Sequence, residues 1–217
     1  MNNSRLERLA PLTGALTAVL ILTGAANGAF DYLPSADRAM EIYSDNPIRM
    51  MVDGYLGLVS VFTLIWFAGS VYSALREREG GTGRLSIVAF GGGVASAMAI
   101  GGGYTVKVAA ATRASAAGGL SPIAAVTSYD LYGTFLGNFT AFTFAAFIGA
   151  TAIVSLRTAM FPRWSGWASA VLALGLISPI GYLFVAFALV WLVGMSISLY
   201  RRGAAQSIPV DPAIGTT

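Results

Sequence analysis

The sequence predicts an all-α fold, a polytopic bundle of transmembrane helices with the N-terminus and the C-terminus both cytoplasmic. Composition is the first reason: the 217 residues are 56% hydrophobic and 11% charged, and the mean hydropathy is +0.70. Soluble domains carry about 25% charged residues, so a chain this apolar cannot cover a surface that faces water. The second reason is that the apolar residues fall in runs near the roughly 20 residues that cross a bilayer.

These runs predict six spans in a single bundle over residues 1–202, with five spans as the alternative. The spans are expected at residues 11–29, 50–75, 85–108, 129–156, 162–177 and 182–200. Residues 203–217, rich in Ala, Ser, Pro and Thr, are expected to form a disordered tail.

The first span begins near Pro11, after a short head that carries Arg5 and Arg8. An uncleaved anchor is one interpretation of this run. A signal peptide is the alternative, because Ala26-Asn27-Gly28 offers the small residues that precede a cleavage site.

Residues 31–46 are polar and acidic, and they predict a short helix that begins at Pro34-Ser35. Its apolar residues share one helical face: Ala36, Ala39, Met40 and Tyr43. That face indicates a helix lying on the membrane surface, and an ordinary connecting helix is the alternative. Asn46-Pro47 then supplies an N-cap and a first-turn proline for the second span.

The last apolar run, residues 167–200, is 34 residues long. A straight helix of that length would measure about 51 Å, against a hydrocarbon core of about 30 Å. Pro179 removes a backbone donor, and Gly181 permits a tight reversal, so the run is expected to form two spans. One long kinked helix is the alternative.

Basic residues predict which side of the membrane each loop faces, because cytoplasmic loops carry an excess of Lys and Arg. With six spans, nine of the 13 basic residues lie in the cytoplasm: Arg5, Arg8, Arg76, Arg78, Arg84, Arg157, Arg163, Arg201 and Arg202. The other four lie outside: Arg38, Arg49, Lys107 and Arg113.

Three stretches occur in a recognisable order. They are Ala39-Met40-Glu41-Ile42-Tyr43-Ser44-Asp45-Asn46, Gly83-Arg84-Leu85-Ser86 before an Ala/Gly-rich helix, and Pro162-Arg163-Trp164-Ser165-Gly166-Trp167. Together they resemble a broad group of uncharacterised actinobacterial integral membrane proteins, over most of residues 10–202. The resemblance implies a small all-helical membrane fold, and it implies no activity and no site residues.

Three ionisable residues share one level of the predicted bundle. Asp53, Lys107 and Asp130 stand 23, 23 and 27 residues from the cytoplasmic arginine of their span, which is about 34–40 Å along each helix. Their common level predicts an outward-facing polar pocket, in which Lys107 pairs with an acid or holds an anionic ligand. Four tyrosines would surround it: Tyr55, Tyr104, Tyr129 and Tyr132. The alternative is a set of snorkelling charges with an interfacial tyrosine belt.

Polar and small residues inside the third and fourth spans indicate helix packing. Asn138 lies two turns inside the fourth span and is expected to make an interhelical hydrogen bond, or else to contact a ligand. Gly93, Ala97 and Gly101 stand four residues apart on one face of the third span. This ladder predicts close approach of another helix, from the same chain or from another subunit.

The residue types present exclude much chemistry. There is no Cys and no His, so disulfides, Cys/His zinc sites, His-ligated haem and a Ser-His triad are impossible. No catalytic constellation, metal site or cofactor site is evident, and the sequence predicts a non-enzymatic protein. The net charge of +3 is explained by topology, so no nucleic-acid partner is expected.

Three functions are consistent with these observations. The first is a multi-pass protein of the cell membrane that acts as an accessory or assembly component, packing through its Gly-rich third helix. Its partners would be the lipid bilayer and other membrane subunits or a second copy of the chain. The alternative is a small transporter, or a protein that binds lipid or a small molecule in the outward-facing pocket. An integral membrane enzyme is the third.

Overall fold

The computed structural model describes residues 9–26 and 34–206, and this part of the chain is helical without any strand. The elements are η1 (Ala10–Leu12), α2 (Thr13–Ala25), α3 (Ala36–Ser44), α4 (Pro47–Glu79), α5 (Arg84–Ser115), α6 (Pro122–Thr134), η2 (Phe135–Phe139), α7 (Thr140–Thr158), α8 (Arg163–Ile177) and α9 (Gly181–Gln206). The predicted all-α fold is therefore confirmed. Four helices are long and apolar enough to cross a membrane: Pro47–Glu79, Arg84–Ser115, the continuous Pro122–Thr158, and Gly181–Arg202.

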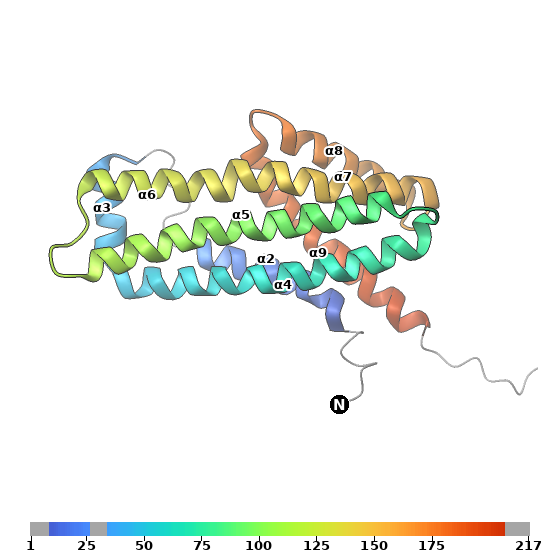
Figure 1. Cartoon of the computed structure of the whole chain (residues 1–217), viewed down its shortest axis with the longest axis horizontal. Helices are drawn as coiled ribbons and strands as arrows, with labels where there is room; N and C mark the ends of the chain where they lie inside the picture. Colours follow the sequence, from blue (N-terminus) through green and yellow to red (C-terminus); the bar gives the residue numbers. More distant parts are fainter. Residues whose placement is uncertain (1–8, 27–33, 207–217) are drawn as a thin grey trace, which may run out of the picture.

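Long antiparallel helices give the bundle its shape (Figure 1). α4, α5 and the continuous α6–η2–α7 run side by side along the long axis, while α9 crosses them obliquely and α8 lies against α7. α2 packs between α4 and α9. We call the end that holds the α4–α5 turn and the end of α7 the arginine end, because Arg76, Arg84 and Arg157 lie there. α3 lies at the far end.

Side-chain caps explain where the helices begin. Asn46 Oδ1 accepts a hydrogen bond from the Arg49 amide at 3.0 Å, and Ser35 Oγ accepts one from the Arg38 amide at 3.2 Å. Both predicted helix starts, Pro34-Ser35 and Asn46-Pro47, are thus confirmed. At the arginine end the Glu79 carboxylate accepts the amides of Leu85 and Ser86 at 2.8 Å, which joins the end of α4 to the start of α5.

The helices do not coincide with the apolar runs. α5 continues to Ser115 and α6 starts at Pro122, so most of the segment that looks like a polar loop between the third and fourth runs is helical. The end of the first run, residues 27–29, lies outside the described residues. α9 extends to Gln206, so the expected tail is helical over its first four residues, and its remainder, 207–217, also lies outside the described part.

α3 has a protein-covered face, contrary to the prediction of a helix that turns this face to the membrane. Ala39 and Tyr43 are fully buried, and they form a small hydrophobic cluster with residues of α4, α5 and α6. Because protein already covers this apolar face, it is not available to lipid. α3 is a connecting helix that closes the far end of the bundle.

The break in the last apolar run occurs where the sequence predicts it. α8 ends at Ile177 and α9 begins at Gly181. The Trp191 indole N–H donates to Ser169 Oγ at 2.8 Å, and a Cβ on Gly175 would lie 2.6 Å from the Phe184 ring. These contacts pair residues at increasing distance from the turn, so α8 and α9 form an antiparallel hairpin and not one kinked helix.

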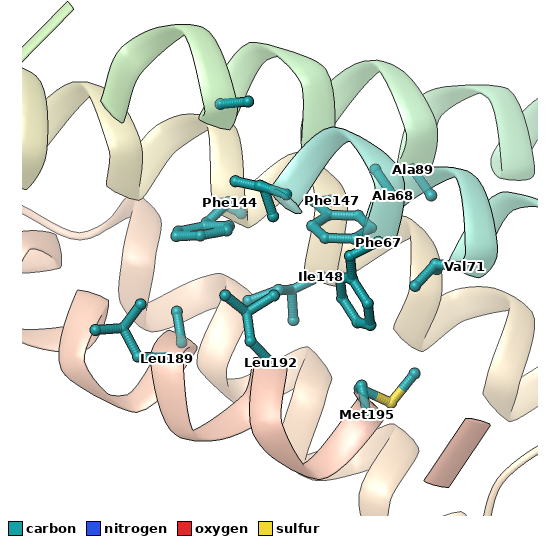
Figure 2. Packing of buried hydrophobic residues seen from close by; sticks show 14 of the residues in the cluster. Phe67, Ala68, Val71, Ala89, Phe144, Phe147, Ile148, Leu189, Leu192 and Met195 are labelled. Carbon is teal, nitrogen blue, oxygen red and sulfur yellow. The ribbon is translucent and has the colours of Figure 1, made fainter. Parts of the chain in front are cut away.

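The main core lies between α4, α7 and α9 (Figure 2). Phe147 stands at its centre, with its ring edge-on to Phe67 at a centroid distance of 6.1 Å and to Trp191 at 5.5 Å. Leu192 and Ile148 fill the space beside these rings. This core and the smaller cluster under α3 are separate, so the far end is a distinct layer of the bundle.

Candidate functional site

A buried lysine holds the C-terminal end of α2. The Lys107 ammonium donates to the Gly24 carbonyl at 2.6 Å, and the Tyr104 hydroxyl donates to the Ile21 carbonyl at 2.6 Å. The last carbonyls of a helix have no intrahelical partner and carry partial negative charge. α5 therefore satisfies the end of α2 with a cation and a phenol, and both side chains are fully buried.

Glycines make this approach possible. A Cβ on Gly57 would lie 2.4 Å from the Tyr104 ring, and one on Gly24 would lie 2.9 Å from the Gly57 Cα. Real side chains do not come that close, so only glycine fits at either position. The backbones of α2 and α4 meet here, and Tyr104 of α5 lies across the junction.

Asp53 completes this group, which we call the lysine cluster: Asp53, Tyr104 and Lys107 with the carbonyls of Ile21 and Gly24. The Asp53 side chain is only 7% exposed, and its carboxylate attracts the Lys107 ammonium. The Asp130 side chain is exposed and lies outside the cluster. Of the two acids that the sequence offers as partners of Lys107, the structure places Asp53 beside it.

Tyrosines surround the lysine cluster. The Lys107 ammonium lies 5.5 Å from the centroid of the Tyr132 ring, and the Tyr104 and Tyr132 rings are 5.9 Å apart. The Tyr132 hydroxyl is buried, and no described residue forms a hydrogen bond with it. Burial, with a smaller contribution from Tyr129, raises the pKa of Tyr43 on α3 above its ordinary value. Tyr43 and Tyr129 belong to the small hydrophobic cluster under α3, whereas the sequence assigned Tyr43 only to an amphipathic face.

A cavity of about 640 Å³ adjoins the lysine cluster. Its walls come from the end of α2, from α5, from α6, η2 and the start of α7, and from the start of α9. The lining residues include Ile21, Leu22, Ala25, Ile100, Tyr129, Asp130, Tyr132, Gly133, Asn138, Phe144, Tyr182 and Leu189. Tyr132 lies between the two features, because the Lys107 ammonium lies over its ring while the same residue lines the cavity.

The cavity is polar toward the far end and apolar toward the middle of the bundle. Along the continuous helix, Phe144, Asn138 and Asp130 stand 13, 19 and 27 residues from Arg157, or about 20, 28 and 40 Å. The acid therefore lies nearest the far end of the bundle, and the phenylalanine lies about 20 Å closer to the arginine end.

A π-helical turn shapes one wall. η2 interrupts the α-helical hydrogen bonding between α6 and α7, and the Thr140 hydroxyl donates to the Phe135 carbonyl five residues earlier at 2.8 Å. The three central residues of this turn, Leu136, Gly137 and Asn138, all line the cavity. π-turns are rare and are frequent at functional sites.

The predicted site residues divide into three groups. Asp53, Tyr104 and Lys107 lie together in the lysine cluster, while Asp130 and Asn138 line the neighbouring cavity. Tyr55 belongs to neither, because its side chain is 60% exposed on the outer face of α4. The single pocket expected from the sequence is thus two adjacent features with Tyr132 between them, and Tyr55 is not part of them.

The small-residue ladder faces α4 of the same chain. A Cβ on Gly93 would lie 2.6 Å from Ala68 Cβ, and one on Gly101 would lie 3.1 Å from Val61 Cγ2; Ala97 between them is fully buried. On another face of α5, a Cβ on Gly92 would lie 2.6 Å from the Phe147 amide nitrogen of α7. Gly92, Gly93 and Gly101 of α5 therefore serve packing within the bundle.

Comparison of the chain with protein-family models, with curated proteins and with solved structures finds no match. The resemblance to actinobacterial membrane proteins stays an expectation, and the function has to be argued from the site.

Proposed function

We propose that the chain is a multi-pass protein of the cell membrane with six spans and both termini in the cytoplasm. Large apolar side chains are exposed on the outside of the bundle, among them Phe62, Trp167 and Val190, at 66%, 64% and 70%. Lipid is the solvent that covers such a surface without cost. The α8–α9 hairpin supports the sixth span, because it returns the chain to the arginine end.

Cysteine labelling tests this topology in a chain that has no cysteine of its own. Ile180→Cys at the α8–α9 turn and Ala117→Cys between α5 and α6 are expected to react with an impermeant thiol reagent on intact cells. Glu77→Cys at the arginine end and Ser207→Cys are expected to react only after lysis. Labelling of Ser207→Cys on intact cells would contradict the six-span arrangement.

We further propose that the protein binds a small amphiphilic molecule in the cavity. One observation carries this proposal: a cavity of about 640 Å³ with a carboxylate toward the far end and mainly apolar walls, a size and character typical of small-molecule sites. An accessory role through the Gly-rich helix has less support, because α4 and α7 already cover the glycines on which it was based.

Filling the cavity is expected to abolish binding. A Cβ on Gly133 meets no atom within 4 Å, and the residue lines the cavity, so Gly133→Phe fills the space without a clash at Cβ. Dodecanol serves as the probe. At about 100 times its dissociation constant it should raise the free energy of unfolding of the wild type by about 2.7 kcal/mol, and that of Gly133→Phe by much less. Thermal unfolding in detergent measures both.

Gly91→Phe is the matched control. Gly91 also meets no atom within 4 Å of a Cβ, lies in a helix that crosses the bundle, and does not line the cavity. It should keep the full stabilisation by dodecanol. Equal stabilisation of both variants would mean that the probe acts through the detergent or the outer surface, and would refute binding in the cavity.

A further inference from the structure

The charged side chain that lines the cavity is an acid. Asp130 is the charged residue among its described lining residues, and no described residue forms an ion pair with it. The rest of the lining is apolar, aromatic or neutral. A ligand headgroup at this end of the cavity would therefore meet a carboxylate that no cation of the described residues neutralises.

Lys107, the basic residue of the lysine cluster, does not line the cavity. Lys107 lies behind the Tyr132 ring, with its ammonium bonded to the Gly24 carbonyl at 2.6 Å and attracted by Asp53. The positive charge of Lys107 thus has its partners inside the lysine cluster. The cluster does not offer Lys107 to an anionic ligand, which is the role that the sequence had suggested for this residue.

The helix ends at the cavity already have partners. The C-terminal turn of α2 contributes Leu22 and Ala25 to the wall, but Lys107 and Tyr104 already donate to its Gly24 and Ile21 carbonyls. The N-terminus of α9 is also close, but the amides of Gly181 and Leu183 already donate to the carbonyls of Ser178 and Ile180 at 2.8 and 3.0 Å. Part of its capacity for an anion is therefore used.

Aromatic rings complete the recognition chemistry. Tyr129, Tyr132 and Tyr182 line the cavity, and organic ammonium ions are attracted to tyrosine faces. The Tyr132 hydroxyl is the buried polar group without a partner among the described residues. Tyrosine rings and a carboxylate in one lining make a site suited to an alkylammonium head.

We propose that the ligand is a lipophilic organic cation, an amine or quaternary ammonium that carries an alkyl chain. Its head lies at Asp130 among the tyrosines, and its chain follows the cavity toward Phe144. This inference rests on the proposed function, since it names the class of amphiphile that the same cavity takes.

Three probes with one alkyl chain test the inference: dodecyltrimethylammonium, dodecanol and dodecanoate, each titrated against the full-length protein in phosphatidylcholine nanodiscs. The wild type should bind the cation about tenfold more tightly than the alcohol, and the anion more weakly than the alcohol. Asp130→Asn should bind the cation and the alcohol with similar affinity. Glu77→Gln, which makes the same change of net charge at the arginine end, should retain the preference.

Two results would overturn the inference, and they differ from failure of the proposed function. Equal affinity for the three probes, or a preference for the cation that persists in Asp130→Asn, would show that the site does not select a cation. If Gly133→Phe still abolishes binding of these probes, binding in the cavity stands and only the preference for a cation is wrong. If Gly133→Phe binds all three probes as tightly as the wild type does, the proposed function fails as well.

Discussion

Replacing Lys107 by methionine is expected to destabilise the protein by about 1.5–3 kcal/mol, the usual range for a hydrogen bond that involves a charged group. Methionine keeps the length of the stem but removes the ammonium. The buried Asp53 then loses the attraction of the ammonium, and the Gly24 carbonyl at the end of α2 loses its donor at 2.6 Å. Equilibrium unfolding in mixed micelles measures the loss.

Two controls separate the charge from the loss of packing. Arg113→Met makes the same kind of change at an exposed position of the same helix, and it should alter stability by no more than about 0.5 kcal/mol. Adding Asp53→Asn to Lys107→Met should recover part of the stability, because the uncompensated carboxylate is gone. If Lys107→Met behaves like Arg113→Met, the lysine cluster does not stabilise the end of α2.

The sequence predicted the level of the polar residues because helix rise is constant. Counting 1.5 Å per residue from the arginines placed Asp53, Lys107 and Asp130 at one depth, and the structure has all three in the cluster or the adjoining cavity. The rise along a helix does not tell which side of the helix a residue faces. Asp53 and Tyr55 are two residues apart, about 200° around α4, so Tyr55 points outward when Asp53 points inward.

The cavity and the π-turn could not be predicted in the same way. The residues of η2, Phe135 to Phe139, are ordinary helix neighbours, and nothing in their types marks a change in hydrogen bonding. The walls of the cavity come from segments far apart in the chain, so its volume depends on how α2 and α9 pack against α6 and α7. The α8–α9 hairpin could be predicted because its signals lie within one segment of the chain. These signals are Pro179 and the length of the apolar run around it.

Introducing leucine at Gly92 is expected to destabilise the bundle by about 3 kcal/mol or more, at or above the upper end of the usual overpacking cost. A Cβ at this position would lie 2.6 Å from the Phe147 nitrogen and 3.1 Å from the Ala146 carbonyl carbon. These are backbone atoms of α7, which cannot rotate aside as a side chain can. α5 and α7 must therefore separate, and Phe147 at the centre of the main core must move with them.

Gly91→Leu provides the comparison, since it adds the same side chain one residue earlier, where a Cβ meets no atom within 4 Å. In that variant the higher helix propensity of leucine acts without a clash, so stability should stay equal or rise by up to about 1 kcal/mol. Gly101→Leu should fall between the two, because its Cβ would meet the Val61 side chain at 3.1 Å, and a side chain can yield. Thermal unfolding of the three variants gives the order. Equal losses at Gly91 and Gly92 would mean that leucine disturbs α5 wherever it is placed, and that close contact with the α7 backbone is not what requires glycine at position 92.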